Sequence, residues 1–194
     1  MSDEWDEYAD GWDNNEDVIS YSEKAFNSLL EAIDIQGLRV LDFGCGTGLL
    51  SEKLSPYARE IVALDTSEKM ISILAKKCLP NVYTISGELT AGLISEQKIF
   101  SEKFDLIIAS SVCSFLPDFE STLTLLKSLL EPGGIFIQWD WLATGNDRDF
   151  GLSEEEILST YNNVGFKLLS LDKAFSLESS EGEMSVIMGM AKKN

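Results

Sequence analysis

The stretch Val40–Leu50 constrains the fold of this chain more than any other. It reads Val-Leu-Asp-Phe-Gly-Cys-Gly-Thr-Gly-Leu-Leu, which is a short apolar run, an acidic residue and three glycines at alternate positions. Val40 and Leu41 resemble the end of a buried strand and Leu49 opens a helical pattern, so the glycines form the turn between them. Glycines permit positive φ and close approach of a ligand, and a helix N-terminus offers unpaired N–H donors. One glycine serves an ordinary tight turn, so three of them after Asp42 predict a nucleotide-binding turn.

The overall charge of the chain limits its partners. The sequence has 194 residues, of which 44% are hydrophobic, and this is enough for one α/β domain with a substantial core. The formal net charge is −18, from 33 acidic and 15 basic residues. Such a charge repels a phosphate backbone, so we expect no nucleic-acid partner.

The absence of histidine limits the chemistry. It removes the commonest general base near neutral pH and the commonest transition-metal ligand, so a proton acceptor has to be Asp, Glu, Tyr or Lys. Cys45, Cys78 and Cys113 have neither zinc-site nor disulfide spacing, so we expect buried reduced thiols and no metal. No apolar run approaches the roughly 20 residues that span a bilayer, and the acidic N-terminus lacks a signal-peptide pattern. We expect a cytoplasmic protein without a membrane partner, and its oligomeric state stays open.

The N-terminal segment has an aromatic helical face. Trp5, Tyr8 and Trp12 are spaced by three and four residues, and Val18–Ile33 follows with the pattern of an amphipathic helix. The aromatic face either packs on the rest of the chain or covers a ligand as a lid, and the two are compatible. We therefore divide the chain into a helical cap or lid, residues 1–36, and a ligand-binding domain, residues 37–194.

After the glycine turn, strand and helix patterns alternate, which indicates a parallel sheet covered by helices. Pro132-Gly133-Gly134 signals a helix end and a turn, Ser153 with Glu156 has the form of a capping box, and a Ser/Glu/Gly-rich turn at residues 176–182 suggests a final antiparallel hairpin. A polar connection is expected at residues 142–149. The predicted strands are Ile61–Leu64, Val82–Ile85, Phe104–Ala109, Ile135–Trp139, Lys167–Leu171 and Met184–Met190, and the predicted helices are Met70–Lys77 with Ser67 as its cap, Phe119–Leu130 and a helix from Ser153 to about Asn163.

Polar residues follow several of these strands. Ligands of open α/β sheets bind beyond the carboxyl ends of the strands, so these residues are expected to share one cleft. Asp65 ends the second strand, where a carboxylate can accept both hydroxyls of an adenosine ribose; the alternative is a surface Asp that caps the next helix. Glu88 follows a flexible glycine and can accept a hydrogen bond from an adenine amine; the alternative is a solvated loop residue.

Together these motifs resemble those of class I S-adenosylmethionine-dependent methyltransferases. The similarity extends over residues 37–140 and rests on Asp42-Phe-Gly44-Cys45-Gly46-Thr47-Gly48, Asp65, Gly87-Glu88, Phe104-Asp105-Leu106-Ile107 and Glu131-Pro132-Gly133-Gly134. The resemblance implies a Rossmann-like, doubly wound, seven-stranded sheet, mostly parallel, with an antiparallel C-terminal strand. It also implies S-adenosylmethionine as cofactor, held by Asp42, Gly44, Cys45, Gly46 and Gly48 at the methionine end, Asp65 at the ribose, Thr66, Glu88 and Leu89 at adenine, and Ser110 near the sulfonium. Glu88 departs from the family, in which Asp is more usual.

An NAD(P)-dependent oxidoreductase is the rival within Rossmann-like folds. Its fingerprint is Gly-x-Gly-x-x-Gly, but Leu49 stands where the third glycine would be. Asp42 beside a pyrophosphate would also cost Coulomb energy, whereas it suits a ligand with an ammonium and a sulfonium.

The predicted reaction is methyl transfer to a small molecule, at oxygen or nitrogen in preference to carbon. Where nucleic-acid and protein amide methyltransferases place an Asn-Pro-Pro-Tyr-like tetrad, this chain has Ser110-Ser111-Val112-Cys113. Asp140 and Tyr21 are the candidate bases, with Tyr8 and Asp118 behind them, and for Asp140 a solvated loop position is the alternative. A catalytically silent cofactor-binding sensor or partner subunit remains the alternative function. The expected acceptor pocket consists of Trp5, Tyr8, Trp12, Tyr21, Cys113, Trp139 and Trp141.

Overall fold

The computed structural model describes residues 2–143, 151–179 and 182–194. The elements alternate between strand and helix after two N-terminal helices, as the sequence pattern predicts. In chain order they are α1 (Ser2–Trp12), α2 (Glu16–Ala32), β1 (Arg39–Phe43), α3 (Leu49–Leu54), β2 (Glu60–Asp65), α4 (Glu68–Lys76), β3 (Val82–Ser86), α5 (Ala91–Glu96), the 3-10 turn η1 (Lys98–Ser101), β4 (Phe104–Ser110), the 3-10 turn η2 (Cys113–Phe115), α6 (Phe119–Leu129), β5 (Leu130–Trp141), α7 (Glu154–Val164), β6 (Lys167–Ser179) and β7 (Gly182–Lys192).

One seven-stranded sheet organises the molecule, in the order β3-β2-β1-β4-β5-β7-β6. The first five strands pair in parallel, and β7 lies antiparallel between β5 and β6. The predicted doubly wound sheet with an antiparallel C-terminal strand is confirmed. The chain leaves β1 toward β2 and β3 on one side and returns to β4 on the other. This reversal creates a switch point between β1 and β4, where ligands of such sheets bind.

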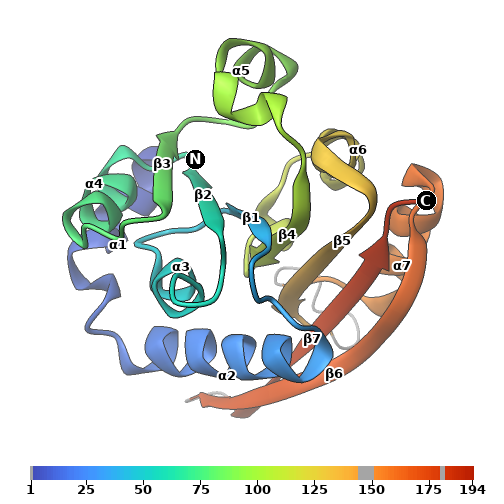
Figure 1. Ribbon diagram of the computed structural model, residues 1–194. Helices are drawn as coiled ribbons and strands as arrows, with labels where there is room; N and C mark the ends of the chain where they lie inside the picture. Colours follow the sequence, from blue (N-terminus) through green and yellow to red (C-terminus); the bar gives the residue numbers. More distant parts are fainter. Residues whose placement is uncertain (1, 144–150, 180–181) are drawn as a thin grey trace.

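Hydrophobic cores cover both faces of the sheet, because successive side chains of a buried strand point to opposite sides. Val40 of β1 packs with Leu29 of α2 and Leu54 of α3, whereas its neighbour Leu41 packs with Leu126 of α6 and Tyr161 of α7. All five residues of β1 are buried. Figure 1 shows α2 and α3 together on one side of the sheet, with α6 and α7 toward the other. The glycine turn after β1 is thus fixed from both faces.

The predicted boundaries of the last three strands are wrong. Helix α6 ends at Leu129 and β5 begins at Leu130, so the Pro132-Gly133-Gly134 stretch lies inside the strand. It forms an irregularity there: Leu130 pairs with Phe104, and Ile135 is the next partner, opposite Leu106. The last two strands are also far longer than the predicted segments, because the apolar alternation of β6 continues to Leu177.

The predicted helix caps are confirmed, whereas three short helical elements were not predicted. Ser67 caps α4, and the Ser153–Glu156 capping box opens α7. Sequence patterns missed α5 and the two 3-10 turns, which are short and carry little periodicity. Most of the polar connection expected at residues 142–149 and the centre of the turn at residues 176–182 lie outside the described residues. Among the described helices, none is both long and apolar enough to span a membrane.

Polar contacts fasten α1 to the rest of the chain. Asp6 accepts a hydrogen bond from the Ser67 hydroxyl and Asp13 accepts one from the Thr47 hydroxyl in the glycine loop. Lys77 Nζ lies 3.0 Å from Asp13 Oδ2. The carboxylates of Asp6 in α1 and of Asp13 directly after it therefore help to hold α1 against the rest of the protein, together with its aromatic residues.

Candidate functional site

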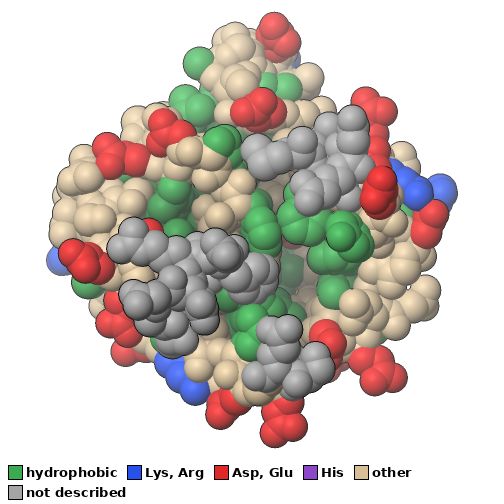
Figure 2. Space-filling model, turned by 180° about the vertical axis from the view of Figure 1, so that it is seen from behind, with side chains coloured by type: hydrophobic (Ala, Val, Ile, Leu, Met, Phe, Trp, Pro, Cys, Tyr) green, Lys and Arg blue, Asp and Glu red, His purple; other side chains and the backbone are tan. Residues whose placement is uncertain are grey.

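A large cavity opens at the carboxyl ends of β1 to β4. Its volume is about 1140 Å³, and its walls come from the loops after these strands, from α1, α2 and the start of α6, and from the end of the β6–β7 hairpin. Figure 2 shows this side of the molecule: hydrophobic side chains line a hollow at the centre, acidic side chains surround it, and basic ones lie at the margins. Ligand pockets usually measure about 300–1,000 Å³. This cavity therefore has room for a cofactor and a second molecule.

The three glycines of the loop after β1 all adopt positive φ, of 70°, 54° and 78° for Gly44, Gly46 and Gly48. A Cβ at Gly44 would lie 2.4 Å from Val112 Cγ2, and one at Gly48 would lie 2.2 Å from Leu74 Cδ1. A Cβ at Gly46 would meet only the Trp12 indole, at 3.7 Å. Gly44 and Gly46 line the cavity, whereas Gly48 lies behind its wall and allows α4 to pack closely.

Two aspartates lie beside this loop on the cavity wall. Asp42 is buried and accepts a hydrogen bond from Ser51 Oγ at 2.6 Å; burial raises its pKa to about 6, and the Ser51 bond opposes the shift. Asp65 accepts the N–H of Gly46 at 2.8 Å on one oxygen and the N–H of Ser67 at 2.9 Å on the other. Burial raises the pKa of Asp65, and these backbone bonds lower it in part. Each Asp65 oxygen keeps a second lone pair for a ligand hydroxyl.

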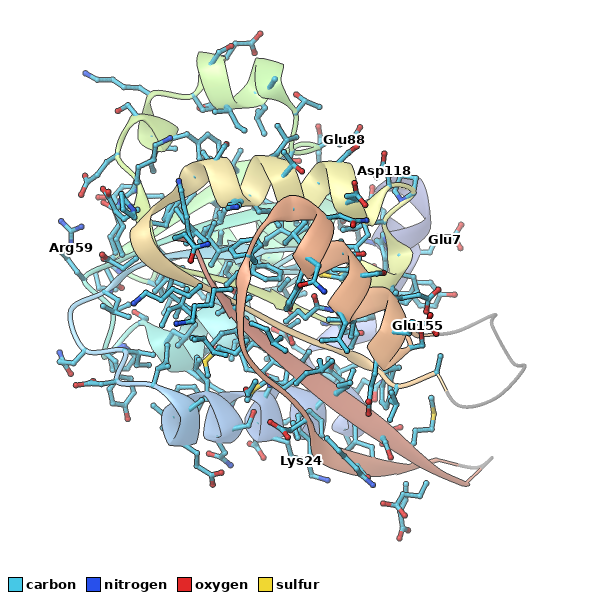
Figure 3. The ribbon with its side chains drawn as sticks, turned by 90° about the vertical axis from the view of Figure 1, so that its right-hand side faces the viewer. Glu7, Lys24, Arg59, Glu88, Asp118 and Glu155 are labelled. Carbon is cyan, nitrogen blue, oxygen red and sulfur yellow. The ribbon has the colours of Figure 1, made fainter. Side chains whose placement is uncertain are left out.

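Residues at the ends of β2, β3 and β4 and before α6 complete the wall of the cavity. Thr66, Glu88, Leu89 and Ser110 line it at the predicted strand ends. Asp118 also lines it, and Figure 3 shows Glu88 and Asp118 toward the same end of the molecule. Asp118 caps α6, because its carboxylate accepts the Ser121 N–H at 2.9 Å and the Ser121 hydroxyl at 2.6 Å. These bonds lower the pKa of Asp118, so it is poorly suited to act as a base.

Asp140 is buried behind the cavity wall. Its carboxylate accepts the Ser114 N–H and the Gln138 side-chain amide, each at 3.0 Å, and Gln138 accepts the Tyr161 hydroxyl at 2.9 Å. Burial raises the pKa of Asp140 to about 7 and its hydrogen bonds lower it in part. The residue has a base-like pKa but does not line the cavity, so the structure does not bring it to the place where a base would act. The alternative of a solvated loop position is wrong, because Asp140 lies buried within β5, and its role as a base stays a prediction.

The predicted acceptor pocket divides into two groups. Trp5, Trp12, Tyr21 and Trp141 line the cavity, and the Trp5 ring packs edge-on against Phe115 with centroids 5.2 Å apart. The other three predicted residues lie elsewhere. Tyr8 is 57% exposed on the outer side of α1, Cys113 is buried in the core, and Trp139 is buried with its indole N–H donating to Ser28 Oγ at 2.9 Å. Trp139 faces α2 because alternate residues of β5 point to opposite sides of the sheet.

The sequence analysis missed several wall residues. The start of α6 and the end of the β6–β7 hairpin contribute Pro117, Ser121, Leu177, Glu178 and Met184, and α2 contributes Asp17, Val18 and Ser22 beside Tyr21. The spacing of the α2 residues would have identified one helical face. The hairpin end was missed because its strands were predicted too short.

The cysteines differ from one another. Cys113 is buried and Cys45 partly buried, whereas Cys78 is exposed, which corrects the expectation of three buried thiols; all three are free. Burial raises the pKa of the Cys45 and Cys113 thiols well above the usual value, so both stay protonated. Within the described residues, no group of three or more Cys, Asp or Glu side chains is arranged to hold a metal ion.

Comparisons with known proteins agree with this architecture. A family model described as "Methyltransferase domain" matches residues 14–171. An uncharacterized methyltransferase of Schizosaccharomyces pombe is 30% identical over 171 residues, which cover 81% of this chain and 58% of that protein. A ubiquinone biosynthesis O-methyltransferase of Rhizobium etli is 34% identical over 101 residues, which cover 52% of this chain and 40% of that protein. The chain thus spans about half the length of these curated relatives.

A solved structure supports the fold over its full length. The structure titled "DhpI-SAH complex" has a TM-score of 0.73 at 21% identity, and the match covers 99% of this chain and 94% of that one. The sequence motifs, the strand order and the family model lead to the same conclusion. The chain belongs to the class I S-adenosylmethionine-dependent methyltransferases.

Proposed function

We propose that this protein transfers the methyl group of S-adenosylmethionine to an oxygen or nitrogen atom of a small molecule. The observation that carries the proposal is the large cavity, whose wall combines the glycine loop, Asp65 and Glu88 with the aromatic side chains of Trp5, Trp12, Tyr21 and Trp141. Its volume of about 1140 Å³ exceeds what one ligand needs. The curated O-methyltransferase relative agrees with an oxygen acceptor.

The wall residues fit this cofactor. Asp65 accepts the ribose hydroxyls, Glu88 accepts the adenine amine with Thr66 and Leu89 against the ring, and Asp42 with the main chain at Gly44–Gly46 holds the methionine end. A cofactor with an ammonium and a sulfonium suits a wall with carboxylates at Asp42 and Asp65. The absence of a Cβ at Gly46 leaves the space that a ligand needs beside the main chain.

The protein's task in this reaction is to position the acceptor and exclude water. When bound, the cofactor supplies a methyl carbon that accepts the acceptor's lone pair while the carbon–sulfur pair returns to sulfur, and the acceptor's proton leaves to solvent. Trp12 lies over Gly46 and Trp5 packs on Phe115, so α1 covers the glycine loop. We propose on this basis that residues 1–36 act as the cap and residues 37–194 as the catalytic domain.

Tyr21 is a hydrogen-bonding residue in this proposal rather than a base. It lies on the cavity wall, and burial together with the nearby Asp140 carboxylate raises its pKa well above the usual value, so its phenol stays protonated. Asp140 acts indirectly, because it holds the Ser114 main chain next to the wall.

Calorimetry and a methyl-transfer screen test the proposal. S-adenosylmethionine and S-adenosylhomocysteine should both bind, and Asp65→Ala should weaken both by about ten- to a hundredfold because two charge-assisted hydrogen bonds are lost. Asp172→Ala, an exposed aspartate on β6, is the control and should bind normally. Transfer to at least one compound is expected in a screen of small phenols, alcohols and amines. Unchanged affinity of Asp65→Ala refutes the ribose assignment, and binding without transfer to any small molecule favours a silent sensor.

A further inference from the structure

We propose that the methyl acceptor is a small organic cation, selected by the carboxylates of Asp17 and Glu178 and oriented by the hydroxyls of Tyr21 and Ser22. The inference rests on the proposed function and names the class of acceptor for the same cavity. All four residues line that cavity. Asp17, Tyr21 and Ser22 come from one face of α2, at positions i, i+4 and i+5, and Glu178 comes from the end of the β6–β7 hairpin.

The charge of the wall is one-sided. Among the described residues that line the cavity, six are acidic and none is Lys or Arg; the acidic ones are Asp17, Asp42, Asp65, Glu88, Asp118 and Glu178. Asp42, Asp65 and Glu88 are assigned to the cofactor, and Asp118 is occupied as the cap of α6. Asp17 and Glu178 are left for a second ligand, and the charged side chains of the described wall would repel a carboxylate or phosphate acceptor.

Neither remaining carboxylate has a partner within the described part of the chain. The side chains of Asp17 and Glu178 make no ion pair or hydrogen bond there, although both lie at a cavity. The nearest basic residues of these elements are occupied: Lys24 Nζ donates to the Ser176 carbonyl at 2.6 Å, and Lys173 Nζ lies 3.5 Å from Glu183. Two carboxylates beside an apolar chamber are thus available to a cationic ligand.

Two buried hydroxyls on the same wall also lack partners. Tyr21 and Ser22 are each 7% exposed, and neither side-chain oxygen has a hydrogen-bond partner within the described residues. The Ser111 side chain lies close enough to lower the pKa of Tyr21 in part, but the pair does not meet hydrogen-bond geometry. Buried polar atoms are nearly always satisfied, and an unmade bond is costly. Because Tyr21 and Ser22 both belong to the cavity wall, a polar group of a bound acceptor is the expected partner for these hydroxyls.

Aromatic rings surround Tyr21 at the cavity wall. The Tyr21 ring lies 5.3 Å from Trp141 and 5.2 Å from Phe175, measured between centroids. Tyr21 and Trp141 both line the cavity. The faces of such rings attract organic cations, most strongly where water is excluded. Charge, aromatic surface and unpaired hydroxyls therefore favour the same ligand class.

The test uses three phenols that differ mainly in charge: tyramine is cationic, 4-ethylphenol is neutral and 4-hydroxyphenylacetate is anionic. Their binding to the protein saturated with S-adenosylhomocysteine is measured by calorimetry, and a parallel set of alkyl alcohols with cationic, neutral and anionic ends extends the panel. We expect the cationic member of each set to bind about tenfold or more tightly than the neutral one and the anionic one not to bind. Asp17→Asn and Glu178→Gln should each reduce that preference by up to about fivefold. Glu31→Gln on α2 and Asp172→Asn on β6 are matched controls outside the cavity and should leave it unchanged.

Tyr21→Phe separates the hydroxyl from the charge. Because the phenol oxygen has no partner in the described protein, this variant should unfold like the wild type, yet bind all members of a set more weakly by about two- to tenfold with the charge preference retained. Equal binding of cationic, neutral and anionic members overturns the proposed selection, as does an unchanged preference in both carboxylate variants. If S-adenosylhomocysteine binds but no member of the panel binds and no small molecule is methylated, the small-molecule function itself fails, and this inference with it.

Discussion

The alternate glycines of the loop after β1 have different roles, and alanine substitutions at Gly46 and Gly48 should separate them. Both residues have positive φ, of 54° and 78°, so an L-residue at either position costs about 1–2 kcal/mol. The neighbours of the added Cβ differ. At Gly46 the nearest atom is Trp12 Nε1, at 3.7 Å, which is ordinary contact. At Gly48 three atoms of the buried Leu74 side chain lie within 2.2–2.9 Å, so that side chain has to move.

The free energies of unfolding should follow this difference. Gly46→Ala should lower the free energy of unfolding only by the cost of placing an L-residue at positive φ, which is about 1–2 kcal/mol. Gly48→Ala adds the cost of overpacking against Leu74, typically about 1–3 kcal/mol, for a total of about 2–5 kcal/mol. Cofactor affinity should show the opposite order, because Gly46 lines the cavity and Gly48 does not. We expect Gly46→Ala to bind S-adenosylhomocysteine at least about tenfold more weakly, which corresponds to about 1.4 kcal/mol.

Urea unfolding of the free proteins gives the stabilities, and calorimetry on the folded proteins gives the affinities. Wild type and both variants are compared under the same conditions, with unchanged m-values required so that the stabilities refer to one transition. The reasoning is refuted if Gly48→Ala is no less stable than Gly46→Ala, since the packing against α4 would then not matter. It is refuted for the cofactor if Gly46→Ala binds normally.

Two further predictions concern stability. The pKa of Asp140 is raised to about 7 in the folded protein, whereas an Asp in the unfolded chain has a pKa of about 4, so the folded state loses stability as the pH rises between these values. Urea unfolding of Asp140→Asn should show a loss of stability from pH 5 to pH 8 that is smaller than the wild-type loss by about 3 kcal/mol. Equal losses in the two proteins would contradict the raised pKa. Arg39→Met should lower the free energy of unfolding by about 3–5 kcal/mol, because the buried guanidinium lies 2.5 Å from Glu60, whose side chain is only 27% exposed. Arg59→Met breaks an exposed ion pair with Glu102 and should lower it by less than about 1 kcal/mol. Similar losses of stability in the two variants would rule out the buried ion pair as the cause.

The fold, and the gathering of the glycine loop, Asp65 and Glu88 at one cavity, were predictable because their signals are local. Val40–Leu50 contains a strand end, three glycines and a helix start within eleven residues, and β1 and α3 form there. Asp65 and Glu88 follow their strands directly, and a parallel sheet brings such positions to one edge whatever the intervening sequence. Gly48 was grouped with the ligand contacts because spacing cannot distinguish a glycine at a ligand from one at a neighbouring helix. Only Leu74, from α4, reveals the difference.

The acceptor end was predicted poorly because it depends on contacts between distant segments. Tyr21 and Leu177 line the same chamber, although 156 positions separate them in the sequence. Trp139 and Trp141 are two positions apart and equally aromatic, yet Trp139 packs under α2 while Trp141 lines the cavity. Strand alternation places both on the same side of β5, so their different roles depend on where the sheet ends. That boundary could not be derived from the residues themselves.

The end of β5 links the buried network to the acceptor chamber. Asp140 fixes the Ser114 main chain in η2 and, through Gln138, meets the Tyr161 hydroxyl of α7. The residues that flank these anchors, Trp141 after Asp140 and Phe115 after Ser114, both line the cavity. The buried Asp140 carboxyl thus has a structural role, because its hydrogen bonds hold the wall segments of β5 and η2 in one arrangement. In this chain a buried titratable group beside the site holds the pocket wall in place, while the proposed acceptor contacts are hydroxyls and carboxylates without partners among the described residues.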